Sequence, residues 1–341
     1  MTNTKEKDKE KEKETRNKKR NIHSMSTDKI SSYGIDGINF EIIPYGSYNN
    51  ISLSLKNYDG KEYVKLVPKG KKVILCICLP RAVRNNNIRP YTLCDTDTII
   101  EIRTEILEAL NEIFFDGYES KLIHAEICGT CEAVGESKCD NIFRLLINSL
   151  LHETEQNKLF VITNKKNGIL PYCSGMQSRT IRNRWSLKAY DKYREMGILS
   201  DRELVRIEFC IKGRQINTTL RNSIDISSVL TQSALEKLIG LYRILFDELT
   251  EDFIRPYLKK AKNVFRQAYI ENKCRPTIPY LKCREIIVDD RIMRNVFSER
   301  YKDRVPEKKN TRQDIKRIKK SHGLPHDTLE TIKKLHYLDE M

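Results

Sequence analysis

The sequence lacks the features that mark several large protein classes. No apolar run approaches the length needed to cross a bilayer, and the first twenty residues are too polar for a secretory signal. It has no Gly-rich Walker loop, no Gly-x-Gly-x-x-Gly fingerprint and no Ser nucleophile elbow. These absences argue against a helical membrane span, nucleotide hydrolysis and dinucleotide binding. We therefore expect a cytoplasmic protein with no membrane partner.

Cysteine, by contrast, is plentiful, with ten residues in the chain. In a cytosolic protein these thiols stay reduced and behave as small hydrophobes, which is the interpretation we favour. Cys128, Cys131 and Cys139 have a spacing that also allows a zinc site. His124 and Cys173 are then the candidates for its fourth ligand.

The charge is strongly of one sign. The chain carries 62 Lys and Arg against 47 Asp and Glu, which gives +15. Such a field favours a polyanionic partner, and nucleic acid is the usual one. General solubility is the alternative explanation. Residues 1–28 alternate Lys and Glu without an apolar face, so we expect a disordered charged tail.

Hydrophobic periodicity predicts an α+β core over 29–220. An Asp-Gly pair at 59–60 predicts a hairpin, and a second hairpin is expected around Asn167-Gly168. The element order suits an antiparallel sheet with helices packed on one face. Expected strands cover 72–79, 121–128, 159–163, 168–172, 185–193 and 203–212, and expected helices cover 96–115 and 140–153.

The C-terminal part changes to helix. Residues 221–306 form a helical region, with the strongest 3.6-residue periodicity over 233–247 and 251–272. Residues 307–341 comprise a charged linker and a helix-turn-helix-like segment. A plain helical hairpin that packs on the body is the alternative for this segment.

The segment 177–212 concentrates the chemistry-bearing residues. Positions 177–194 hold six basic residues and one acid, with Tyr190 and Tyr193 on either side of Lys192. A second strand follows and carries Arg206 and Glu208 in an apolar run. A basic approach, an alternating strand and a tyrosine beside lysines are typical of a site that handles a phosphodiester.

This arrangement resembles the replication initiators of rolling-circle plasmids and filamentous phages, together with the related conjugative relaxases. The resemblance covers roughly residues 70 to 215. It implies a ferredoxin-like replicase fold, a DNA nickase that forms a 5′-phosphotyrosine bond and a divalent metal held by carboxylates. The pattern rests on Ser178, Arg179, Leu187, Lys188, Tyr190, Asp191, Lys192, Glu195, Leu204, Arg206 and Glu208.

Tyr190 is the candidate nucleophile. On an extended strand, Lys188 and Lys192 share its face, and a nearby ammonium favours the phenolate. Tyr193 is the weaker candidate, since it lies on the opposite face if the strand continues. The alternative is that Tyr190 is simply a packed strand aromatic.

Glu126 and Glu208 are the candidate metal ligands, because each carboxylate stands in an apolar strand where burial is costly without a cation. His124 precedes Glu126 by two positions and joins them. Mg²⁺ or Mn²⁺ suits such a site. Cross-strand pairing of Glu208 with Lys188 or Arg184 is the alternative. The chain departs from many nicking enzymes because its six histidines include no His-hydrophobe-His pair.

Two functions follow. One is an initiator-like, site-specific nickase and strand transferase, acting on single-stranded or hairpin origin DNA as a possible homodimer and with host replication proteins. The other is an inactive scaffold that binds nucleic acid and regulates or inhibits another nucleic-acid machine. The expected DNA contacts are Arg179, Arg182, Arg184, Lys188 and Arg206.

Overall fold

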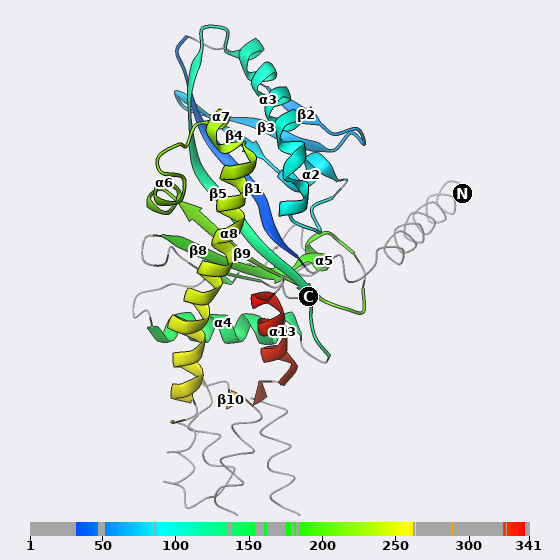
Figure 1. The fold of residues 1–341 in the computed structure, drawn as a ribbon. Helices are drawn as coiled ribbons and strands as arrows, with labels where there is room; N and C mark the ends of the chain where they lie inside the picture. The colour runs from blue at the N-terminus through cyan, green and yellow to red at the C-terminus, as the bar shows by residue number, and fades with distance from the viewer. Residues whose placement is uncertain are drawn as a thin grey trace, which may run out of the picture.

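A nine-stranded sheet forms the centre of the molecule in the computed structural model (Figure 1). Its strand order is β2-β3-β4-β1-β5-β9-β8-β7-β6, and each of these pairings is antiparallel. The structure describes residues 32–46, 52–84, 86–135, 138–153, 160–161, 175–178, 181, 184–198, 200–261, 263, 288–289, 323–324 and 326–337.

The strands of the large sheet are β1 (Ser32–Pro44), β2 (Ser54–Lys56), β3 (Glu62–Lys69), β4 (Lys72–Ile77), β5 (Tyr118–Glu132), β6 (Phe160–Val161), β7 (Gly175–Gln177), β8 (Trp185–Asp191) and β9 (Leu204–Lys212). A separate parallel pair joins β10 (Val288–Asp289) to β11 (Gly323–Leu324). The helices are α2 (Leu79–Val83), η2 (Leu93–Thr98), α3 (Ile99–Ile113), α4 (Cys139–Glu153), α5 (Lys192–Glu195), α6 (Arg214–Leu220), α7 (Ile226–Val229), α8 (Gln232–Leu249), the π-helical turn η3 (Thr250–Ile254) and α13 (His326–His336).

Helices cover one face of the sheet, and Figure 1 shows α8 lying across it with α3 beside it. The residues of strand β8 show why the helices pack on this face. Trp185, Leu187 and Ala189 are fully buried on the helical side, and they alternate with the more polar Ser186, Lys188 and Tyr190. An antiparallel sheet with helices on one face is the α+β fold expected from the sequence, and that expectation is confirmed.

Aromatic rings join the sheet to α8. Phe209 of β9 lies edge-on to Trp185 at 5.4 Å and to Tyr242 at 5.9 Å between ring centroids. Tyr242 also donates a hydrogen bond of 2.9 Å to the carbonyl of Leu335 in α13. This places α13 against the body, as the helical-hairpin alternative predicts for this helix.

Several boundaries differ from the sequence-based expectation. The strand expected over 185–193 ends at Asp191, because that carboxylate accepts the N–H of Tyr193 at 3.0 Å and caps α5. The tail 1–28, the second arm of the 159–172 hairpin and the first helix of the C-terminal segment lie outside the described residues.

Candidate functional site

The predicted site residues lie mainly on the face of the sheet opposite α8. In the ladder between β8 and β9, Lys188 stands opposite Glu208 and Tyr190 opposite Arg206. In the next ladder, Glu126 of β5 stands opposite Cys210 of β9. Side chains two residues apart share a face, so these three strands bring the predicted residues to one surface.

Tyr190, Glu208, Lys188 and Glu126 form a continuous chain of contacts. The Tyr190 hydroxyl donates a hydrogen bond to Glu208 Oε1. Lys188 Nζ lies 3.5 Å from Glu208 Oε2 and donates to Glu126 Oε1. The ammonium therefore bridges the two carboxylates predicted to hold a metal. Cross-strand pairing with Lys188, the alternative drawn from the sequence, is present in this structure.

Burial shifts the pKa values of the groups in this series of contacts. It raises the pKa of Glu208 to about 7, with further contributions from Asp36 and Glu126. Burial and the neighbouring Glu208 also raise the pKa of Tyr190 well above its usual value. The nearby lysines thus do not produce a phenolate, contrary to the expectation from the sequence. Glu208 is instead the group placed to accept the phenol proton.

Lys192 contacts the same tyrosine from the first turn of α5. Its side chain is fully buried, and Nζ lies 5.6 Å from the centroid of the Tyr190 ring. Glu195 Oε2 lies 2.8 Å from Nζ, although this ion pair lacks the angles of a hydrogen bond. The predicted neighbourhood of Lys192 and Tyr190 is present, with Lys192 on a helix rather than a strand.

Tyr193 has a separate environment. Its ring is buried with Ile88 and Leu204. Its hydroxyl donates to Glu132 Oε1 at 3.4 Å, and burial raises its pKa to about 12. Tyr190 is thus the tyrosine in contact with Glu208.

Arg206 is fully buried beside Tyr190, with no exposed side-chain surface for a DNA phosphate in this conformation. Its guanidinium donates to Asp36 Oδ1 at 3.0 Å, to Thr130 Oγ1 at 3.0 Å and to the backbone carbonyls at Asn87 and Ile88. Arg206 therefore fixes the 87–88 backbone over this part of the sheet.

Asp36 is a site residue that sequence reasoning missed. It sits where the register of β1 against β5 shifts, between Ile35 and Gly37. Burial opposes its ionisation, but the charges of Arg206 and Lys192 and the hydrogen bond from Arg206 lower its pKa overall. An aspartate in the otherwise apolar run around Ile35 was the available signal, but its partner is 170 residues away.

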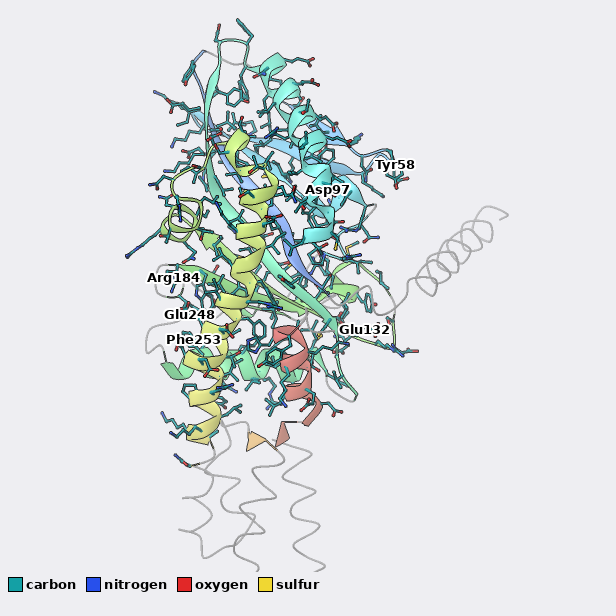
Figure 2. The ribbon with its side chains drawn as sticks, in the orientation of Figure 1. Tyr58, Asp97, Glu132, Arg184, Glu248 and Phe253 are labelled. Carbon is teal, nitrogen blue, oxygen red and sulfur yellow. The ribbon has the colours of Figure 1, made fainter. Side chains whose placement is uncertain are left out.

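Arg184 takes part in tertiary packing. Its guanidinium donates to Glu248 Oε2 of α8 at 3.1 Å and to Gln215 Oε1 of α6 at 2.9 Å (Figure 2). Figure 2 shows Arg184 and Glu248 close together at the side of the sheet. Arg179 and Arg182 lie outside the described residues, so contact of these arginines with DNA stays a prediction.

Two groups of potential metal ligands are present among the described residues. One contains His124, Glu126 and Cys210, and the other contains Cys139, Asp191 and Glu203. Asp191 in the second group already accepts backbone N–H groups and pairs with Arg194 at 3.2 Å, which explains its position as a helix cap.

The two groups include neither Cys128 nor Cys131, which are buried thiols of β5. Cys173 lies outside the described residues. Cys128, Cys131 and Cys139 are all buried, which fits the interpretation of these thiols as small hydrophobes.

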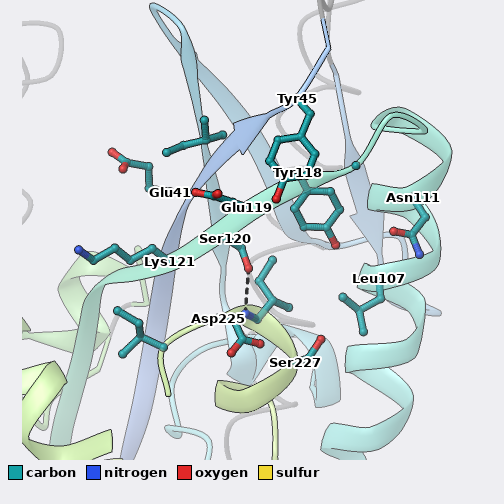
Figure 3. A pocket seen from close by; sticks show the side chains of 14 residues that line it. Glu41, Tyr45, Leu107, Asn111, Tyr118, Glu119, Ser120, Lys121, Asp225 and Ser227 are labelled. Atoms are coloured by element: carbon teal, nitrogen blue, oxygen red, sulfur yellow. Dashed lines mark hydrogen bonds between the residues drawn. The ribbon is translucent and has the colours of Figure 1, made fainter. Parts of the chain in front are cut away.

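A separate hollow of about 710 Å³ lies at the far end of β1 and β5 (Figure 3). Tyr45 and Tyr118 stand on one side of it, Leu107 of α3 on another, and Asp225 before α7. None of the predicted site residues lines this hollow.

Comparison with solved structures gives only weak likeness. No family model and no curated protein matches the chain. A solved structure described as a rolling circle replication initiator protein from Geobacillus stearothermophilus matches 65% of this chain and 85% of its own, at 11% identity. The TM-score is 0.34, which is too low to carry an argument about fold or function. Among the described residues, no helix is long and apolar enough to span a membrane.

Proposed function

We propose that this chain is an initiator-like DNA-binding protein that nicks and rejoins single-stranded DNA through a 5′-phosphotyrosine at Tyr190. The observation that carries the proposal is the contact chain from the Tyr190 hydroxyl through Glu208 and Lys188 to Glu126. Four residues singled out from the sequence thus meet at one place. The charge of +15 supports a nucleic-acid partner.

The proposed step is an in-line exchange at phosphorus. The Tyr190 oxygen forms a bond to phosphorus while its proton passes to Glu208. The bond from phosphorus to the 3′-oxygen breaks, and that oxygen leaves with a proton from water. A 3′-hydroxyl later reverses the reaction and closes the strand. Holding the nucleophile against its base replaces a bimolecular encounter with an oriented one.

Positive charge near the phosphate comes from the chain's own lysines. Lys188 is partly exposed and lies between two carboxylates, so a phosphate oxygen can compete for its ammonium. Lys192 is buried behind the Tyr190 ring and supports the site from within. Such preorganised cations stabilise charge that develops on the equatorial oxygens.

A divalent metal is part of the proposal. Mg²⁺ or Mn²⁺ held by Glu126, Glu208 and His124 supplies Lewis-acid polarisation of the phosphate when bound. The donor set fits an ion at the Glu126 end, where His124 Nε2 lies 4.0 Å from the carboxylate. Glu208 is engaged with Tyr190, which favours its use as the proton acceptor.

The test asks which part of the cut strand stays attached to the protein. Full-length protein is incubated with Mn²⁺ and a pool of random-sequence single strands labelled at the 3′ end, then resolved by denaturing electrophoresis. The wild type should retain the 3′ label as a slow adduct, and strands labelled at the 5′ end should not. Tyr190→Phe should abolish the adduct, because it removes only the attacking oxygen.

Tyr193→Phe is the matched control and should leave the adduct in place. Loss of the adduct in Tyr193→Phe alone moves the nucleophile to that residue. A wild type that binds the strands but never forms an adduct overturns the nickase. It leaves the nucleic-acid-binding regulator as the function. Dimerisation and host replication proteins are further proposed partners, to be sought by light scattering and pull-down.

A further inference from the structure

Cys210 brings a third potential ligand to the Glu126 end of the site. Its sulfur, a carboxylate oxygen of Glu126 and a ring nitrogen of His124 all lie within 4.8 Å of one another. His124 and Glu126 alternate along β5, and Cys210 stands opposite Glu126 in the ladder to β9. Strand pairing therefore creates a group that no local sequence pattern contains.

We infer that His124, Glu126 and Cys210 form a site for a transition-metal ion of the zinc class. Nitrogen, oxygen and thiolate donors together suit Zn²⁺, whereas Mg²⁺ takes oxygen ligands in an octahedron. Three protein ligands leave one tetrahedral position for water or a phosphate oxygen, which is the pattern of catalytic zinc sites. The ion therefore differs in class from the Mg²⁺ or Mn²⁺ predicted from the sequence and proposed above for the nickase, and it would take their place on Glu126 and His124.

The surroundings support the ligand set. The side-chain amide of Asn39 lies 3.3 Å from His124 Nδ1, so Nε2 is the ring nitrogen that faces Glu126. The amide nitrogen of Asn39 is the atom that faces Nδ1 here. A metal on Nε2 needs the ring proton on Nδ1, so the Asn39 amide must rotate to present its oxygen as the acceptor when the ion binds. Ser186 hydrogen-bonds to Cys210 from β8. Outer contacts of this kind orient the ligands of natural metal sites.

A metal ion can reach this site from solvent, where it competes with the ammonium of Lys188. Side chains of His124 and Glu126 keep 18% and 22% of their surface exposed, so an ion can reach them from solvent, while Cys210 forms the buried wall. Lys188 donates to the Glu126 oxygen that also faces His124, so an incoming ion displaces this ammonium. Lys188 Nζ already lies 3.5 Å from Glu208 Oε2, so that carboxylate offers the displaced ammonium a partner.

The ion's role in strand transfer rests on the proposed function, but its binding does not. Binding is therefore measured without DNA, on the full-length chain after removal of metal with a chelator. Co²⁺ is the probe, because a cobalt–thiolate bond gives a charge-transfer band in the near ultraviolet. We expect this band on titration, its loss on addition of Zn²⁺, and its persistence in a large excess of Mg²⁺.

Cys210→Ser should lose the charge-transfer band, while Cys76→Ser, a half-buried thiol of β4 outside the group, should keep it. Asn39→Ala should weaken Co²⁺ binding on the order of 10–100-fold, as loss of an outer partner does elsewhere. Circular dichroism checks that each variant is folded. A band that survives in folded Cys210→Ser, or that Mg²⁺ removes as readily as Zn²⁺, overturns the inference. A band without any DNA adduct keeps the metal site and rejects only the nickase.

Discussion

At the scale of single residues, close packing makes some positions important for stability although the residue there has no reactive group. Gly129 lies on β5 beneath the Tyr242 ring, and a Cβ added there meets the tyrosine oxygen at 2.0 Å. Tyr242 is fully buried, so neither partner has room to move. Gly240 on α8 has open space instead, with no heavy atom within 4 Å of an added Cβ.

Gly129→Ala should therefore destabilise the fold by about 1–3 kcal/mol or more, the usual cost of overpacking. Gly240→Ala should stabilise it by about 0.5–1 kcal/mol, because alanine restricts the unfolded chain and favours helix. Urea denaturation curves measure both. Equal midpoints for Gly129→Ala and the wild type contradict the close contact with Tyr242.

Asp95 provides a pH-dependent contribution to stability. It caps η2 by accepting the N–H and hydroxyl of Thr92 at 2.8 and 2.9 Å, and it pairs with Arg84. Burial opposes ionisation, yet Arg84 and Thr92 lower the pKa of Asp95 below its usual value of 3.8. The stabilisation is thus complete above pH 3.8 and is lost as pH falls through the folded pKa.

Asp95→Asn should cost about 0.5–2 kcal/mol near neutral pH, as loss of a cap does. The difference from wild type should shrink as pH falls below 3.8 and through the folded pKa. Asp97→Asn, an exposed neighbour in η2, is the control and should show little effect at either pH. A pH-independent difference for Asp95→Asn means that charge is not the cause.

At the scale of elements, α13 illustrates how a segment can look separable in sequence and still belong to the core. Leu335 is fully buried, and its carbonyl accepts from Tyr242 of α8. Thr331 accepts the N–H of Val134 at 2.9 Å, and the ring of His336 stacks on Phe246 at 5.2 Å. Removing α13 therefore exposes part of α8.

Leu335→Ala should destabilise the whole domain by about 2–5 kcal/mol, the range for large-to-small changes in a core. Lys333→Ala, exposed on the same helix, should stay within about 0.5 kcal/mol of wild type. Chemical denaturation followed by tryptophan fluorescence reports on the distant β8, where Trp185 is the single tryptophan. An unchanged midpoint for Leu335→Ala means that α13 does not contribute to the domain's stability.

At the scale of the whole molecule, charge and architecture act together. The long helices α3 and α8 lie on one face of the sheet, and on the other face Lys188 and the exposed Lys212 keep contact with solvent. Lys237 is equally exposed but projects from α8 on the helical side. A net charge of +15 attracts any polyanion, and the arrangement of the elements decides which charges a strand contacts.

Binding of single-stranded DNA should weaken steeply with salt. Each neutralised phosphate adds about −0.7 to the slope of log K against log salt concentration. Lys212→Gln should make the slope shallower by about 0.7, whereas Lys237→Gln should leave it unchanged. Filter-binding titrations at several salt concentrations provide the slopes. A wild-type slope near zero removes nucleic acid as the partner.

The sequence alone determined the local structure and pointed to several residues of the candidate site. Period-two alternation located β8, β9 and β5, and the isolated acids in those strands pointed to Glu126 and Glu208. Alternation also placed Lys188 and Tyr190 on one face, because side chains two residues apart in a strand always share one.

Only the tertiary structure decided which strands are neighbours and in what register. Pairing across β1, β5 and β9 brings Asp36, Cys210 and Arg206 to the site from distant parts of the chain. The same pairing buries Arg206, and the helix cap at Asp191 separates Tyr193 from Tyr190. Register depends on packing between whole strands, and a shift of one residue would turn every side chain to the other face.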